Sequence, residues 1–422
     1  MKILVKQAVI ADPNSPFNGQ ITDILIDGDK IVSIAPGITA AADEVIEANG
    51  LIVSPGWVDI FSHFCDPGFE YRETLETGAN AAAAGGFTDV FVLPNTKPVV
   101  DSKSQVEYIS RQSGLLAAHV HPLGAITKGT EGKDLAEMYD MKNSGAVAFT
   151  DGTNPVQSPG LFLKALQYVK AFDGVLVQVP LDKSIGAGGL INEGVISTRL
   201  GLPGIPALAE EIIIKRDIDL LRYTQSKLHI TGISTQKSIE LIAAAKKEGL
   251  SISCSVTPYH LFFCDEDMQT YDTNLKLNPP LRTKADMLAL REAVLNGGID
   301  CIASHHMPQD WDNKTCEFEY AKNGMTGLET SFAIINHLLP ELSRERLVQL
   351  FSLNARTIFH LPVSHISENS SAELTLFTTS GTTCISKQTL QSKSPNTPFL
   401  DRELNGKILG TIHKGKLTLN QN

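Results

Sequence analysis

The sequence predicts an α/β fold: a (β/α)8 TIM barrel with a small β-sandwich module that is built from both chain ends. From Trp57 onward, eight apolar strand-like runs are each followed by a helix-length segment, as a closed barrel of eight parallel strands requires. Most of these runs are apolar at successive positions, which is typical of parallel strands buried on both faces. The 422 residues, 42% of them hydrophobic, suffice for one large domain and a smaller companion.

The two chain ends carry the β-module, and the barrel lies between them. Residues 1–54 contain short β-type runs with turn signals at Asp27-Gly28 and Asn49-Gly50, and residues 365–422 return to strand patterns. We therefore expect residues 1–54 and 365–422 to form the module and residues 55–364 to form the barrel. The eight expected barrel strands are WVDIFSHF, FTDVFVLPN, AAHVHPLGAI, AVAFTDG, GVLVQVP, KLHITGIS, SISCSVTPY and IDCIASHH.

Composition excludes several classes of function. The net charge of -11 comes without any cluster of Lys and Arg, which argues against binding to nucleic acid. The N-terminal run MKILVKQAVI is too short and too interrupted for a signal peptide or a membrane helix. The six cysteines lie far apart with no C-x-x-C pair, which fits reduced thiols. We expect a cytoplasmic protein that binds neither nucleic acid nor membrane.

Several segments resemble dihydroorotases and related cyclic-amide hydrolases, and they follow the family's order over nearly the whole chain. In this fold the active site lies at the C-terminal ends of the strands. The resemblance implies a metal-dependent barrel enzyme that opens or closes the dihydroorotate ring in pyrimidine biosynthesis, with two metals activating a water and an aspartate moving the proton. The segments are PGWVD, ETLETGANAAAAGGFTDVFVLPNTKPVVD, LGLPGIPALAEE, NPPLRTKADMLALREAV, GLETSF and SPNTPF.

The positions that carry the family's chemistry are largely substituted. Where the family has H-x-H-x-R, this chain has Phe61 in place of a metal ligand and Cys65 in place of the arginine that clamps a substrate carboxylate. The ligand histidines of the fifth and sixth strands are replaced by Gln178 and Gly232. His305 stands at the usual position of the catalytic aspartate, where an imidazole brings no anionic charge.

Five retained or substituted residues remain candidates for a site. His63, Asp151 and His305 follow the first, fourth and eighth strands and could hold a single metal ion. Alternatively, His63 is a hydrogen-bonded polar residue and Asp151 caps a turn or helix. Asn95 and Asn278 match positions that bind substrate in the family, although both also lie in turn-forming contexts where Asn is common.

These substitutions predict a dihydroorotase homologue that is catalytically inactive and needs no cofactor. The resemblance suggests that such a chain is retained for its surface, as a homo-oligomer that partners aspartate transcarbamoylase or another enzyme of the pyrimidine pathway. The alternative is a catalytically active hydrolase of a cyclic amide, with one zinc ion held by His63, Asp151 and His305 and a water in the open position.

Overall fold

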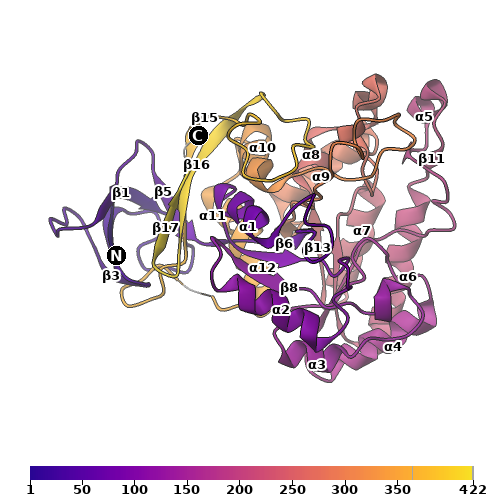
Figure 1. Cartoon of the computed structure of the whole chain (residues 1–422), viewed down its shortest axis with the longest axis horizontal. Helices are drawn as coiled ribbons and strands as arrows, with labels where there is room; N and C mark the ends of the chain where they lie inside the picture. The colour runs from indigo at the N-terminus through magenta and orange to yellow at the C-terminus, as the bar shows by residue number, and fades with distance from the viewer. Residues whose placement is uncertain (364, 421–422) are drawn as a thin grey trace.

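A closed barrel of eight strands forms the centre of the molecule (Figure 1), whose computed structural model describes residues 1–363 and 365–420. The fourth predicted run pairs through Phe149, which bridges Gly124 on one side and Leu176 on the other. A bridge between Ser62 and His306 closes the ring, so the barrel prediction is confirmed. The other strands are β6 (Trp57–Ser62), β7 (Phe87–Val92), β8 (His119–Pro122), β9 (Val175–Gln178), β12 (Lys227–Thr231), β13 (Ile252–Val256) and β14 (Cys301–Ile302).

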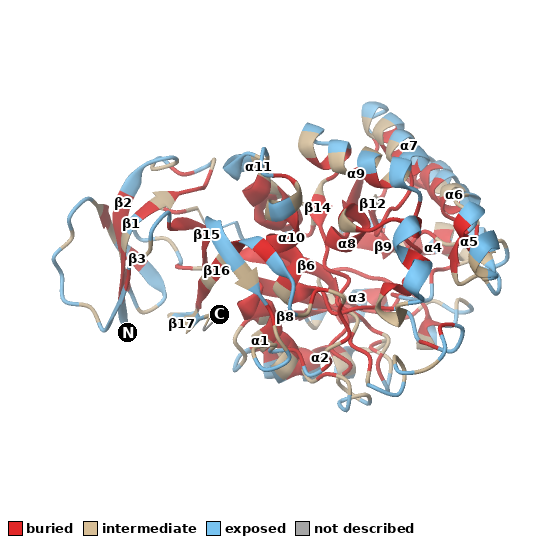
Figure 2. Ribbon diagram, turned by 90° about the horizontal axis from the view of Figure 1, so that it is seen from above, coloured by how far each residue is buried: buried red, intermediate tan, exposed pale blue. Residues whose placement is uncertain are grey.

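Helices follow the strands and surround the barrel. In Figure 2 the strands β6, β9 and β12 are buried, whereas α6 and α7 expose their outer faces. This layering explains the apolar runs, because each strand is covered on both faces. The helices are α1 (Leu75–Ala84), α2 (Lys103–Ser113), α3 (Met138–Asn143), α4 (Pro159–Lys170), α5 (Val195–Leu200), α6 (Leu208–Thr224), α7 (Gln236–Lys247), α8 (Pro258–Phe262), α9 (Lys284–Asn296), α10 (Ser331–Leu338), α11 (Arg344–Val348) and α12 (Asn354–Ile358).

Hydroxyl side chains fix where several of these helices begin. Thr74 accepts a hydrogen bond from the backbone N–H of Thr77 at the start of α1, and Ser158, Thr235 and Thr283 cap α4, α7 and α9 in the same way. Each cap of this kind contributes about 1 kcal/mol to helix stability. The caps end the loops that follow the strands, and these loops form the mouth of the barrel.

Strands from the two chain ends form one eight-stranded sheet beside the barrel (Figure 1). Its order is β17-β16-β15-β5-β1-β2-β3, with β4 pairing with β1, and the antiparallel pair of β5 with β15 joins the two ends. The strands are β1 (Lys2–Ile10), β2 (Ile21–Asp27), β3 (Lys30–Ala35), β4 (Glu44–Ile46), β5 (Ile52–Pro55), β15 (Leu374–Cys384), β16 (Glu403–His413) and β17 (Lys416–Leu419).

This sheet has an apolar core of its own. Both chain ends contribute to the core, with Ile10 and Ile26 from the N-terminal part and Leu374 from the C-terminal part. The fold class with a β-module from both chain ends is therefore confirmed, whereas the boundaries after residues 54 and 364 stay a prediction. A short parallel pair, β10 (Ile191–Asn192) with β11 (Gly204–Ile205), lies in the long loop after β9.

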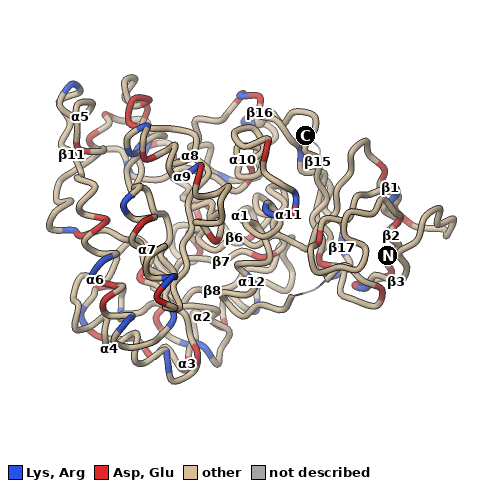
Figure 3. The backbone as a smooth tube through the Cα atoms, turned by 180° about the vertical axis from the view of Figure 1, so that it is seen from behind, with Lys and Arg blue, Asp and Glu red and all other residues tan. Residues whose placement is uncertain are grey.

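Basic and acidic positions are interspersed along the backbone in the view of Figure 3. None of the helices in the described residues combines the length and the apolar character that crossing a membrane requires.

Candidate functional site

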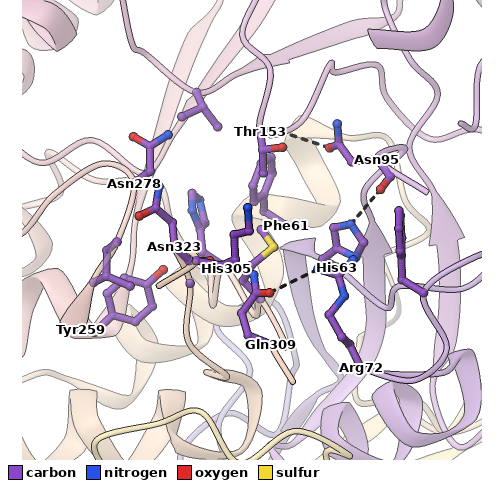
Figure 4. A pocket seen from close by; sticks show the side chains of 16 residues that line it. Phe61, His63, Arg72, Asn95, Thr153, Tyr259, Asn278, His305, Gln309 and Asn323 are labelled. Atoms are coloured by element: carbon purple, nitrogen blue, oxygen red, sulfur yellow. Dashed lines mark hydrogen bonds between the residues drawn. The ribbon is translucent and has the colours of Figure 1, made fainter. Parts of the chain in front are cut away.

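A cavity of about 360 Å³ opens at the C-terminal mouth of the barrel (Figure 4). It lies where a barrel enzyme of this type carries its active site, because the loops after β6, β7 and β14 contribute to its wall. Of the predicted site residues, all except Asp151 line this cavity, namely His63, Asn95, Asn278 and His305. Four of the five predicted residues thus share one cavity, and their side-chain contacts decide what they can do.

Both ring nitrogens of His63 are engaged by the protein. Nδ1 accepts a hydrogen bond from the backbone N–H of Cys65 at 2.9 Å, so Nε2 carries the proton and donates to the carbonyl of Asn95 at 3.0 Å. Burial lowers the pKa of His63 to about 4, so the ring is neutral at physiological pH. His63 thus joins the loops after β6 and β7, and no lone pair is left for a metal in this arrangement.

Two aromatic rings fill the place where the family has a ligand and a carboxylate. The Phe61 and His305 rings lie 4.3 Å apart, centre to centre, with an interplanar angle of 32°. The Nε2 atom of His305 is 2.7 Å from the hydroxyl of Thr231, and burial lowers the pKa of this imidazole to about 3. His305 is therefore a neutral, packed ring with one nitrogen already paired.

Gly232 explains why this packing is possible. Its φ is +71°, and a Cβ added there would lie 2.5 Å from Cε1 of His305. Real Cβ atoms do not approach this closely, so a histidine at 232 and a histidine at 305 exclude one another without a local shift. The two substitutions at the mouth are sterically coupled.

Asp151 acts on the loop that precedes it rather than on the cavity. Its two carboxylate oxygens accept hydrogen bonds from the backbone N–H and the hydroxyl of Thr127. Burial raises the pKa of Asp151 to about 6. The side chain of Asn95 completes this connection, since it donates to the Asp151 carbonyl at 3.1 Å and accepts from the N–H of Thr153 at 3.2 Å. Asn95 and Asp151 therefore serve as backbone clamps.

Gln178 also turns into the protein. Its amide is paired with the backbone of Val156, at 3.3 Å to the N–H and 3.4 Å to the carbonyl. The substituted ligand position of the fifth strand thus stabilises the loop before α4.

Asn278 differs from the other candidates, because its Oδ1 atom is buried without a hydrogen-bond partner among the described residues while its side chain lines the cavity. Sequence reasoning missed Arg72 and Lys322, two cationic residues of the wall, and also Tyr259 and Asn323. None of the four belongs to a family motif that marks a site residue, so no signal in a single sequence identifies them.

Arg72 is held in place by its neighbours. Its guanidinium carbon lies 4.5 Å from the centre of the Phe69 ring, and Nη1 donates to the side chain of Gln309 at 3.3 Å. Arg72 therefore brings a positive charge to the mouth from a different loop position than the missing arginine at Cys65.

The predicted ligands His63, Asp151 and His305 are not brought together as a metal site. The nitrogens of His63, the oxygens of Asp151 and one nitrogen of His305 all have protein partners. The side chains at the mouth therefore do not fit the two-metal arrangement of the family. Over residues 1–363 and 365–420, the one set of three donor side chains whose ligand atoms lie within 4.8 Å of one another is found elsewhere, on β7 and β8.

The closed barrel, the chain-end sheet and the mouth cavity together define the class of fold, which solved structures of cyclic-amide hydrolases share. An L-hydantoinase (dihydropyrimidinase) from Arthrobacter aurescens has the same fold, with a TM-score of 0.87 at 23% identity over 100% of this chain and 96% of that one. A D-hydantoinase aligns with a TM-score of 0.85 at 20% identity.

Sequence comparison narrows this class. The family model described as "Dihydro-orotase-like" matches residues 50–238. A dihydroorotase of Syntrophus aciditrophicus is 37% identical over 422 residues, which cover 99% of both chains, and one of Carboxydothermus hydrogenoformans is 40% identical over 397 residues. The chain belongs to the dihydroorotase family, as its motifs predict.

One expectation is corrected by these comparisons. We expected the chain to need no cofactor, but dihydroorotases and hydantoinases are zinc-dependent amidohydrolases, so that expectation is wrong for a member of this family. The alternative of one zinc ion is partly consistent with the family. The error arose because the cofactor was inferred only from the substituted positions at the mouth.

Proposed function

We propose that this dihydroorotase homologue has lost the ring-opening and ring-closing reaction and is retained for its fold and surface. The observation that carries the proposal is the packing of the His305 ring against Phe61, where the family places a proton-transferring carboxylate and a metal ligand. The scaffold around this point is intact, since the similarity to dihydroorotases extends over 99% of the chain.

The reaction needs an activated water, a polarised carbonyl and a group that moves a proton. His305 is a poor substitute for the aspartate, because its imidazole is neutral and its Nε2 atom is paired with Thr231. Burial raises the pKa of Cys65 to about 12, so this thiol offers no charge to a substrate carboxylate. Each role would have to be filled by a residue outside the family motifs.

The alternative function is a cyclic-amide hydrolase that uses a reduced site at His63, Asp151 and His305. It requires these side chains to give up their hydrogen bonds to Asn95, Cys65, Thr127 and Thr231. Each of these hydrogen bonds joins two groups of the protein. Breaking one so that its donor or acceptor can bind a metal costs about 1 kcal/mol or more of free energy. We therefore favour the inactive homologue.

The test is an assay of dihydroorotate hydrolysis and of carbamoyl aspartate cyclisation with added zinc, using the Syntrophus relative as the active control. We expect rates at background for this chain. Turnover that a chelator removes and that Asp151→Ala or His63→Ala abolishes would instead establish the reduced-site hydrolase.

The proposed role needs a partner, and by analogy within the family we propose aspartate transcarbamoylase or another enzyme of the pyrimidine pathway, bound by a homo-oligomer of this chain. We also propose a cytoplasmic location, which the six unpaired cysteines support. Sedimentation of the chain mixed with aspartate transcarbamoylase from the same cells should show a faster complex, and independent sedimentation of the two would contradict the pairing.

A further inference from the structure

The third strand of the barrel carries two histidines that none of the family's motifs uses. His119 and His121 are the first and third residues of β8, so their side chains share one face of the strand. The parallel register pairs Asp89 of β7 with His119, which places a carboxylate beside the two imidazoles. His119 begins β8, Asp89 lies in the first half of β7, and none of the three residues lines the mouth cavity.

The ligand atoms of these residues converge on one point. Nε2 of His121 is 2.8 Å and Nδ1 of His119 is 3.9 Å from Oδ1 of Asp89. Ligands at about 2.1 Å from a tetrahedral zinc ion are about 3.4 Å apart, so the two distances bracket the required spacing. The two rings lie 4.0 Å apart, centre to centre, and tilt by 31°.

The surrounding residues hold the carboxylate in the orientation that a ligand needs. Oδ2 of Asp89 accepts hydrogen bonds from Nη2 of Arg356 at 2.6 Å and from the hydroxyl of Thr88 at 2.9 Å. Oδ1 is thereby left on the side of the imidazoles. Hydrogen bonds of this kind to the far oxygen orient metal ligands in proteins.

The group is reachable from solvent on one side. The side chain of His119 is 40% exposed, whereas those of Asp89 and His121 are 10% and 11% exposed. No hydrogen bond of the His119 ring is found within residues 1–363 and 365–420, so neither of its nitrogens is committed to a hydrogen-bond partner there. The donor geometry is present before any cation arrives.

A third imidazole, from the chain-end sheet, lies next to the group. The His413 ring centre is 6.1 Å from that of His119. Nδ1 of His413 is bonded to the carboxylate of Glu373, but its Nε2 is buried without a partner in the described part of the chain. A buried nitrogen without a protein partner is usually satisfied by a water or an ion.

We propose that Asp89, His119 and His121 form a binding site for one divalent transition-metal ion, with a water in the fourth position. Two imidazoles and one carboxylate favour Zn²⁺, Co²⁺ or Ni²⁺ over Mg²⁺ and Ca²⁺, which prefer oxygen ligands. The ion connects β7 to β8 beside the chain-end sheet. The site is separate from the mouth, so the proposal of a metal site does not depend on the proposed loss of activity.

The competing explanation is that Asp89 only forms a buried ion pair with Arg356, to which His121 adds a hydrogen bond. Under that explanation His119 has no role, because it is half-exposed and 3.9 Å from the carboxylate. The two explanations therefore differ most clearly at His119, whose substitution leaves the buried ion pair intact.

The test is a titration of tag-free, chelator-treated full-length protein with Co²⁺ and Zn²⁺, followed by visible absorption and calorimetry. We expect one ion per chain and the absorption of tetrahedral cobalt. His119→Ala should weaken binding at least about tenfold. The matched control is His63→Ala, which removes a buried imidazole at the mouth and should leave this affinity unchanged.

His121→Ala provides a second variant that spares the pair of Asp89 with Arg356, should the first one be affected in folding. Absence of a stoichiometric ion in the wild-type chain would overturn the proposal. So would a loss of binding in His63→Ala with full binding in His119→Ala, because that result would place the ion at the mouth.

Discussion

At the mouth of the barrel, His63 has both ring nitrogens engaged by backbone groups, whereas toward the opposite end His119 makes no hydrogen bond to the described residues and faces a carboxylate. The carboxylates differ in the same way. Both oxygens of Asp151 are used by Thr127, but Asp89 keeps one oxygen directed at two imidazoles. The same residue types thus act as clamps in one region and as converging donors in the other. Oδ1 of Asp89 is bonded to His121, which is itself a candidate ligand, so the partners of the donor atoms distinguish the two regions where residue identity alone does not.

The largest expected difference between the two regions concerns their carboxylates. Asp89→Ala leaves the guanidinium of Arg356 buried without its partner at 2.6 Å, which should lower the free energy of unfolding by about 3–5 kcal/mol. Asp151→Ala removes hydrogen bonds to one loop residue and should cost about 1–3 kcal/mol. Urea unfolding of both variants measures the difference, with Asp89→Asn as the control that keeps the shape. Equal losses would show that the two carboxylates have the same kind of role.

The next effect tests the coupled packing at the mouth. Gly232→Ala should cost about 1–3 kcal/mol, because the new Cβ meets the His305 ring and φ is in the left-handed region. In a His305→Ala background the same change should cost only the backbone strain, about 1 kcal/mol. A double-mutant cycle on unfolding free energies measures this coupling. Additive costs would mean that the mouth tolerates a side chain at 232.

Restoring the family residues tests how far the mouth has been remodelled. A variant with Phe61→His, Cys65→Arg, Gln178→His, Gly232→His and His305→Asp removes the clash of 232 with 305 and should gain an additional cation. The five changes are made in a His119→Ala background, which weakens the proposed site on β7 and β8, so that any metal uptake can be assigned to the mouth. Equilibrium dialysis against zinc measures the gain. A folded variant without this gain would show that the mouth, including the loop held by Asp151, no longer allows the family geometry.

The smallest effect concerns the thiol that replaces the arginine. At about pH 8, Cys65 should not react with a disulfide reagent in the folded protein, because burial raises its pKa to about 12. The exposed Cys384 should react at once and serves as the internal control. Peptide mass spectrometry locates the modified residues. Modification of Cys65 as fast as Cys384 would show an open, solvated mouth.

The fold was predictable because buried barrel strands give apolar runs that are easily recognised in the sequence. Runs such as FTDVFV are buried at every position and form β7, and the turns at Gly28 and Gly50 are confirmed by positive φ values. The fourth strand was also expected, although it pairs only through single bridges at Phe149. Periodicity and turn residues act locally, so a single sequence records them.

The state of the site residues was much less predictable. That His63 lies at the mouth follows from its place after the first strand, but its bond to the carbonyl of Asn95 depends on how a distant loop is folded. His119 and His121 were not singled out from the sequence, because their closeness to Asp89 depends on the register between β7 and β8. Contacts between segments distant in sequence decide which donor atoms stay free.

Anomalous scattering at the zinc edge, from crystals of the full chain soaked in zinc, tests the comparison between the two ends most directly. The account predicts that the strongest peak lies between Asp89 Oδ1, His119 Nδ1 and His121 Nε2, with His63 still bonded to the Asn95 carbonyl. A strongest peak beside His63 and Asp151, with their hydrogen bonds to Asn95 and Thr127 broken, would contradict it.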